Sequence, residues 1–538
     1  MTNSTAAAAD AQKDALRESI SQNMVASIVT RVLYLGSRVF VPPITLMYVS
    51  LDEYGVWACC IVLISYLGMS AFGVSNVYIR EVAGYAARGE LERIDRLVST
   101  GMTVVLAVGV ALLVGLWFLL PFVVDLFRIA PELHRTAFVL FFGTVAVLVL
   151  DLSLGAFAYV LQGLQKMAEE RVVWVTSVLL ETVLMIAFLM LGFGVYGLLY
   201  AFAIRYVVAT ILYARACYRA LPGLSIRLSL FDREAVGLFW HYGGIVQLSG
   251  LLGIFLRSIE RVLAGVFIGV SATALYDIGE KLPMMGSMVA SAMNGAFLPA
   301  TTHLHETSRR RELIALYLKG SRYMNMMIGT MMGFLAAFAA PIIAVWIGAD
   351  ERYAGAAAIL AIFTYPYQIN VLTGPGSAIF RGVREPVREL LYPIVQLALV
   401  AVLVGVGWST VGPTIPMINV TVATAMIVSA VVYLVYTNRY LGVPEGEYWW
   451  KVHVPGLVPY AFGFALAALF APWLHAGLSR WEGLAVLAVA GAVYGLVVPA
   501  VLFRFFCDWG EREYLRGQVR RTLSGVLPRR WTAAPAAR

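Results

Sequence analysis

The chain has 538 residues, of which 60% are hydrophobic and only 13% are charged, with a formal net charge of +8. A soluble chain carries about twice that share of charged residues, and the apolar residues here fall into runs of twenty or more along the whole length. Composition therefore excludes a soluble fold, because each run is long enough for a helix to cross about 30 Å of hydrocarbon. The four cysteines have neither metal-site nor disulfide-framework spacing.

Fourteen apolar runs predict an all-α integral membrane protein, because an open chain in lipid satisfies its backbone groups only as helix. The first run is too long for the apolar core of a signal peptide, so we expect it to remain as a span. In chain order the predicted spans cover 24–50, 54–80, 98–124, 136–161, 171–192, 194–217, 237–268, 271–302, 315–348, 353–380, 388–408, 415–438, 452–474 and 482–506.

The distribution of basic residues predicts the orientation of these spans. With the N-terminus inside, 30 of the 40 lysines and arginines lie in cytoplasmic segments and only 4 lie in outside loops. This asymmetry is what the positive-inside rule predicts, and it places both termini in the cytoplasm. The net charge is then mostly a topology signal, and no nucleic-acid partner is needed to explain it.

The loop over 218–236 divides the predicted spans into two sets of six with the same orientation, which indicates a parallel repeat. Aligning Val49 with Ile268 without gaps places Arg38 on Arg257. We therefore expect two six-helix lobes around a central cavity, plus two extra C-terminal helices. The expected parts are a cytoplasmic segment 1–23, an N-lobe 24–217, the inter-lobe loop 218–236, a C-lobe 237–438, two spans within 439–506 and a basic cytoplasmic tail 507–538.

Charged side chains within apolar spans are costly and usually face a cavity or a partner. The candidate anion-binding residues are the cations of spans 1, 7 and 8: Arg31, Arg38, Arg257, Arg261 and Lys281. Guanidinium groups hold phosphates through paired, charge-assisted hydrogen bonds, so this set suits a pyrophosphate or an acidic sugar. The alternative is that the cations of spans 7 and 8 only neutralise nearby acids, as Lys281 and Asp277 would at i,i+4 spacing.

Carboxylates in the same spans are candidates for coupling a proton or a sodium ion. These are Glu181, Glu260, Asp277 and Glu280. Arg205 and Asp151 are instead interpreted as a pairing between helices. Pro42 and Pro43 follow Arg38 closely and are candidates for a gating hinge, because proline removes a backbone donor and bends a helix. A structural kink is the alternative.

Catalytic signatures are lacking in the sequence, which has no Walker loop, no metal-spaced histidine pair and no nucleophile elbow. We therefore expect a protein that is not an enzyme, with no metal and no cofactor other than a coupling ion, H⁺ or Na⁺. The energy would then come from ion gradients, membrane potential or product removal.

Two stretches resemble a known family. They are GVFIGVSATALYDIGEKLP over 265–283 with FLP at 297–299, and APIIAVWIG over 340–348 with YAGAAAILAI over 353–362. Both resemble the polysaccharide-transporter branch, the Wzx-type flippases, of the multidrug/oligosaccharidyl-lipid/polysaccharide (MOP) exporter superfamily. The resemblance implies an undecaprenyl-pyrophosphate-linked oligosaccharide as substrate, taken by alternating access from the inner to the outer leaflet of a bacterial cytoplasmic membrane. It also implies membrane lipids and polysaccharide polymerase or export machinery as partners.

The working hypothesis is thus a lipid-linked oligosaccharide flippase for surface polysaccharide biosynthesis. One alternative is a cation-coupled multidrug antiporter of the same superfamily, although the cationic excess argues against it. A membrane-embedded glycosyltransferase or ligase would need a large outer loop and paired acids, which are absent here. A non-transporting scaffold of a polysaccharide assembly complex stays open.

Overall fold

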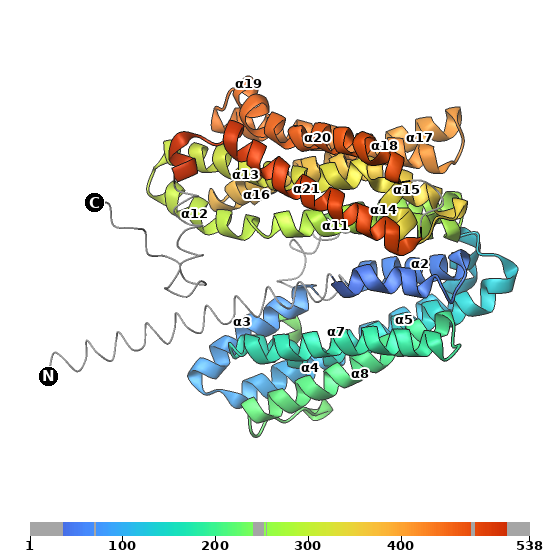
Figure 1. Ribbon diagram of the computed structural model, residues 1–538. Helices are drawn as coiled ribbons and strands as arrows, with labels where there is room; N and C mark the ends of the chain where they lie inside the picture. The colour runs from blue at the N-terminus through green and yellow to red at the C-terminus, as the bar shows by residue number, and fades with distance from the viewer. Residues whose placement is uncertain (1–35, 69–71, 240–251, 254, 475–478, 514–538) are drawn as a thin grey trace, which may run out of the picture. The chain divides into compact units, whose positions relative to one another are not determined.

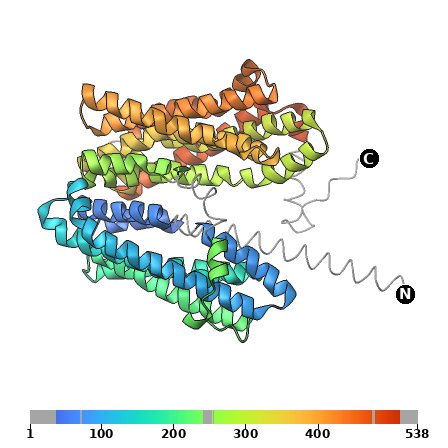
Figure 2. The ribbon, with the colours of Figure 1, turned by 180° about the vertical axis from the view of Figure 1, so that it is seen from behind.

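The computed structural model describes residues 36–68, 72–239, 252–253, 255–474 and 479–513 (Figures 1 and 2). Regular secondary structure in these ranges is entirely helical, as predicted. The helices are α2 (Leu51–Gly68), α3 (Phe72–Arg88), α4 (Leu91–Leu126), α5 (His134–Leu154), α6 (Ala156–Gly163), α7 (Met167–Met190), α8 (Val195–Ala220), α10 (Ile259–Phe267), α11 (Val270–Ser291), α12 (Asn294–Glu306), α13 (Arg310–Ala337), α14 (Ala339–Trp346), α15 (Ala354–Val371), α16 (Thr373–Gly382), α17 (Leu391–Thr410), α18 (Ile415–Leu441), α19 (Glu445–Tyr448), α20 (Val454–Phe470) and α21 (Arg480–Phe506). A further helix covers 36–45. The predicted segment 1–23 and the tail beyond 513 lie outside the described residues.

Ten helical segments of the described chain are long and apolar enough to cross a membrane, and α13 with α14, bent by 74°, adds an eleventh if the pair is one span. Two of the other predicted spans, 24–50 and 237–268, lie partly outside the described ranges. The third, 271–302, is divided into α11 and α12, and α11 carries the three charged residues Asp277, Glu280 and Lys281. The protein is thus a multi-span helical membrane protein, while the count of fourteen stays a prediction.

The chain packs into two compact units, which are described separately. The first contains the chain up to 285 together with 346–359 and 390–429, and the second contains 286–345, 360–389 and the chain from 430 onward. This partition differs from the predicted lobes 24–217 and 237–438, which stay a prediction.

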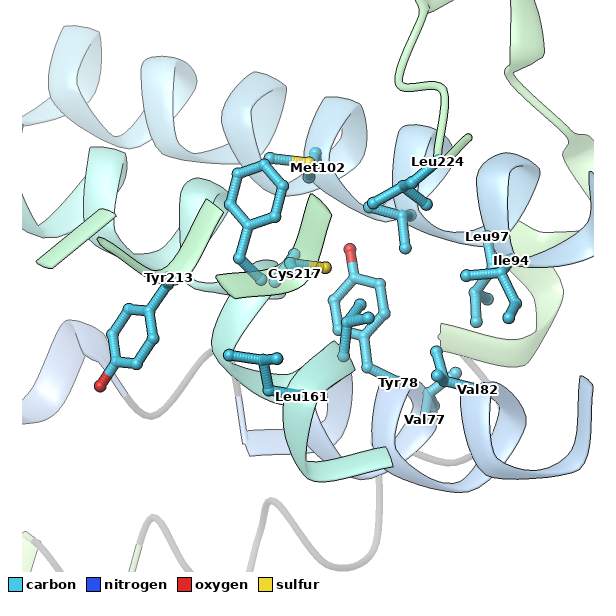
Figure 3. Close-up of a cluster of buried hydrophobic side chains, with 14 of the residues drawn as sticks. Val77, Tyr78, Val82, Ile94, Leu97, Met102, Leu161, Tyr213, Cys217 and Leu224 are labelled. Carbon is cyan, nitrogen blue, oxygen red and sulfur yellow. The ribbon is translucent and has the colours of Figure 1, made fainter. Parts of the chain in front are cut away.

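The first unit has an apolar core where α3, α4, α6 and α8 meet. Figure 3 shows the Tyr78 ring of α3 among side chains from α4, α6 and α8, including Leu161 and Cys217. Gly101 of α4 makes this packing possible, because a β-carbon there would overlap the Tyr78 ring and hydroxyl. Burial of this kind fixes α3, α4, α6 and α8 against one another.

The starts of α2 and α11 meet directly within the first unit. Asp52 accepts a hydrogen bond from the Ser271 hydroxyl, and a β-carbon at Gly55 would overlap the backbone carbonyl of Val270. Asp52 and Ser271 are equivalent positions in the repeat alignment of the sequence. The internal repeat itself stays a prediction.

The second unit is held by a buried polar network between α13, α15 and the start of α20. A π-helix, Trp449–His453, precedes α20. The Asn325 amide donates to the carbonyls of Val452 at 2.7 Å and His453 at 3.0 Å, and Gln368 donates to Asn325 Oδ1 at 2.7 Å. The network therefore docks the predicted thirteenth span against α13, because each amide satisfies a group that lipid cannot.

The helix over 36–45 continues through both candidate hinge prolines. Pro43 has no N–H to donate to the carbonyl of Val39, four residues earlier. The indole Nε1–H of Trp346 donates to that carbonyl at 2.8 Å instead. Trp346 belongs to the APIIAVWIG motif, so one residue of this motif supplies the hydrogen bond that the proline removes. The hinge role of Pro42 and Pro43 stays a prediction.

Replacing Trp346 tests this substitute hydrogen bond. We expect Trp346→Phe to destabilise the protein by about 1 kcal/mol, the usual contribution of one hydrogen bond. In a Pro43→Ala background the effect should shrink, because alanine at position 43 restores the backbone donor to Val39. Thermal unfolding of the purified chain in detergent measures both, with the exposed Trp473→Phe as control. Equal effects in the two backgrounds would contradict the role assigned to Trp346.

Candidate functional site

The charged residues of α10 and α11 form a buried polar cluster with α2, centred on Asp277. Lys281 Nζ donates to Asp277 Oδ2 at 2.7 Å, and the Tyr54 hydroxyl donates to the same oxygen at 2.6 Å. Arg261 Nη1 lies 3.6 Å from Asp277 Oδ1. One carboxylate thus binds groups from three helices, and its two oxygens are divided between a lysine and an arginine.

Helix geometry explains part of this arrangement. Asp277 and Lys281 are one turn apart on α11, where side chains at i and i+4 are neighbours. The predicted i,i+4 pair therefore forms. The Tyr276 hydroxyl anchors the same turn to α18 by donating to Asn419 Oδ1 at 2.5 Å.

Arg261 pairs across helices rather than within its own helix. Its Nη2 lies 3.5 Å from Glu280 Oε2 on α11, and its backbone carbonyl accepts a hydrogen bond from Thr273 at 3.2 Å. The sequence analysis left open whether the cations of span 7 bind an anion or neutralise nearby acids, and that choice stays a prediction. Arg261 forms ion pairs with Asp277 and Glu280, because both carboxylates face it from the neighbouring helix.

Glu260 and Glu280 are the least matched charges of the cluster. Both side chains are almost completely buried, with Glu280 at 0% exposure, and the two carboxyl groups interact electrostatically with each other. Glu260 Oε1 and both oxygens of Glu280 accept no hydrogen bond from the described residues. Two ionised carboxylates cannot donate to each other, so one proton between them would supply the missing hydrogen bond.

Polar groups of α2, of α10 with the segment before it, and of α11 act electrostatically on this carboxyl pair. Arg257 and Arg261 of α10 and the segment before it act electrostatically on Glu260. Tyr66 of α2 interacts electrostatically with Glu260, and Tyr276 of α11 interacts electrostatically with both glutamates.

The two outer cations of the predicted set lie beside this cluster. Arg38, in the helix over 36–45, is partly exposed and acts electrostatically on Tyr54 and Lys281. Arg257 is exposed and lies beside Glu260. Arg261 and Lys281 thus belong to the cluster, and Arg38 and Arg257 lie within electrostatic range of its members, whereas Arg31 lies outside the described residues.

Glu181 lies apart from this cluster, in a buried pair between α7 and α8. Its Oε2 accepts a hydrogen bond from Arg205 Nη1 at 2.8 Å, and both side chains are buried. Asp151, interpreted from the sequence as the partner of Arg205, lies within electrostatic range, but Glu181 makes the direct contact. The pairing between helices is therefore present, with a different carboxylate.

Sequence reasoning missed the role of Tyr54. No local pattern shows that its hydroxyl reaches Asp277, 223 residues away. Within the described part of the chain, no three histidine, cysteine, aspartate or glutamate side chains are arranged to hold a metal ion.

Solved structures with this fold are membrane transporters. An inward-facing multidrug resistance MATE family transporter of the MOP superfamily is 19% identical, with a TM-score of 0.62 over 77% of this chain and 94% of its own. The lipid II flippase MurJ in an inward closed conformation is 12% identical, with a TM-score of 0.64 over 89% of this chain and 98% of its own. A MOP superfamily transporter from Pyrococcus furiosus, described by the reverse polarity of its binding pocket, is 18% identical with a TM-score of 0.50, covering 77% and 95%.

The fold is therefore that of the MOP superfamily transporters. Residues 16–305, more than half of the chain, match the family described as polysaccharide biosynthesis protein, and the chain belongs to that family. No curated protein matches the chain. The family and the transporter fold confirm the resemblance seen in the sequence motifs and agree with the prediction that the chain is not an enzyme.

Removing the central carboxylate tests how the cluster is balanced. We expect Asp277→Asn to destabilise the protein by about 3 kcal/mol, because it leaves Lys281 buried without its carboxylate partner. Asp277→Asn combined with Lys281→Met removes both members of the pair and should recover most of that stability. Thermal unfolding in detergent measures both variants. A double variant no more stable than the single one would show that Asp277 acts mainly through Tyr54 and Arg261.

Proposed function

We propose that this protein is a flippase that moves an undecaprenyl-pyrophosphate-linked oligosaccharide from the inner to the outer leaflet of a bacterial cytoplasmic membrane. The lipid-linked glycan would serve the biosynthesis of a surface polysaccharide or exopolysaccharide, such as an O-antigen. Membership of the polysaccharide biosynthesis family supports the pathway, and the transporter fold supports alternating access.

The observation that carries the proposal is the charge balance of the cluster. If Glu260 and Glu280 share one proton, they and Asp277 carry two negative charges, which match Arg261 and Lys281. Arg257 then adds a positive charge at the more exposed edge of the cluster, and the partly exposed Arg38 lies within electrostatic range of Tyr54 and Lys281. Paired guanidinium groups are suited to a pyrophosphate, which presents several anionic oxygens at once.

The direction of movement also suits an anionic substrate. Moving negative charge out of a negative cell interior releases about 2.3 kcal/mol per charge per 100 mV. The membrane potential therefore favours export even without a coupling ion.

The rival functions in the sequence analysis fit the cluster less well. A multidrug antiporter for cations would use an acidic site, whereas Arg38 and Arg257 lie at the accessible edge here. A non-transporting scaffold would not need these two arginines at all, so their replacement separates it from a flippase.

Export should depend on both outer arginines. We expect Arg38→Ala and Arg257→Ala each to lower export about tenfold or more, since each removes a charge-assisted contact to the substrate. Complementation of a strain lacking this protein, at matched membrane expression, gives surface polysaccharide and the leaflet in which the lipid-linked intermediate accumulates.

Arg135→Ala is the matched control, because Arg135 is exposed on α5 and is not part of the cluster. Accumulation on the inner leaflet in both cluster variants, but not in the control, supports the flippase. Normal export by both cluster variants would remove them from the substrate site.

For the coupling ion we propose a proton shared by Glu260 and Glu280. Asp277 and Glu181 are weaker candidates, since each accepts a hydrogen bond from a cationic side chain, whereas neither oxygen of Glu280 accepts one from a described residue. Loss of the shared proton would add a negative charge beside Arg257 and Arg261 and weaken anion binding. Such linkage is reciprocal, so bound anion would also retain the proton.

The pair predicts a pH-dependent affinity for inorganic pyrophosphate. We expect the affinity of the wild type to fall as pH rises, by about fivefold or more beyond any fall in the Glu260→Gln/Glu280→Gln variant. Comparison with the variant corrects for the change in affinity that comes from the titration of pyrophosphate itself. Parallel profiles would rule out this proton site, and a dependence on Na⁺ instead of pH would assign sodium to it.

A further inference from the structure

A groove lies between the first turns of α7 and the last turns of α8, away from the polar cluster. Its volume is about 580 Å³. It is lined by Ala168, Glu169, Val172, Val173, Leu212, Arg215, Ala216 and Arg219. Five of these eight side chains are apolar, and the other three are charged.

The charged end of the groove carries a net positive charge. Arg215 and Arg219 are exposed, one turn apart on α8, and neither forms a hydrogen bond or ion pair with another described residue. The only acid of the lining, Glu169, is paired with Lys166 at 3.3 Å. Side chains at i and i+4 on a helix lie about 5–6 Å apart at Cβ, so one phosphate can contact both guanidinium groups.

The position of the groove along the helices points to a lipid. Arg215 and Arg219 lie in the last turns of a span that ends at Ala220, so they lie at the depth of lipid headgroups. Toward the middle of the span, Val207 and Ile211 of α8 expose apolar side chains, and Val172 on α7 is 65% exposed. A lipid with its phosphate at the arginines could therefore place an acyl chain along these apolar side chains.

We propose that this groove binds one anionic phospholipid, with its phosphate between Arg215 and Arg219 and an acyl chain along Val172 and Leu212. Basic pockets between spanning helices at the membrane surface are suited to anionic headgroups. Such a lipid would join α7 to α8 at one end of the helix pair that also contains the Glu181–Arg205 contact. The site is independent of the proposed substrate and its cluster.

Native mass spectrometry of the delipidated full chain tests the site with phosphatidylglycerol as the probe. We expect Arg215→Gln/Arg219→Gln to weaken the first bound phosphatidylglycerol about tenfold, the effect of losing charge-assisted contacts. Ala168→Trp should weaken it similarly without any change of charge, because the new side chain fills the groove. Phosphatidylcholine with the same chains should bind more weakly to the wild type.

The matched control is Arg227→Gln/Arg233→Gln, which removes two exposed arginines just after α8 that do not line the groove. It should bind phosphatidylglycerol like the wild type. Equal lipid binding by the groove variants and this control would overturn the proposal. Complete displacement of the lipid by inorganic phosphate would also overturn it, since the site would then bind phosphate alone.

Discussion

A charge placed among apolar helices needs a partner of opposite charge. Asp277 is that partner for two cations, and it also accepts a hydrogen bond from a hydroxyl. Lys281, Arg261 and Tyr54 reach its two oxygens from α11, α10 and α2. Since an unmatched charge in hydrocarbon is so costly, this single carboxylate limits how those three helices can be arranged. The geometry of the candidate site follows from that requirement.

The helical membrane fold could be predicted from the sequence because lipid leaves few alternatives. A run of twenty apolar residues has to be a helix, and the basic loops set the expected orientation. The i,i+4 pair of Asp277 and Lys281 could be predicted for the same local reason. Breaks within spans were missed: α11 and α12 are separate helices where one span over 271–302 was predicted, and α13 bends sharply into α14.

Contacts between distant segments could not be predicted. Trp346 reaches Val39, and Tyr54 reaches Asp277, because packing brings together residues more than 200 positions apart. Arg205 illustrates the same limit, since two acids, Asp151 and Glu181, were available on neighbouring spans and only the packed structure distinguishes them. Local periodicity has no information on which of two distant partners lies nearer.

The cations of one cluster can be paired with carboxylates and still take part in substrate binding. An isolated arginine in a membrane would be too costly to keep, whereas Arg261 and Lys281 can be kept because carboxylates match them. The carboxylates in turn limit how strongly the cluster holds an anion, and a transporter needs binding that can be reversed on the other side. In the proposed flippase, Arg38 and Arg257 would bind the anion at the edge of the matched core, and the core would set how tightly it is held. The structural pairs would then be a condition of transport, because they would let the cationic edge exist at membrane depth and release what it binds.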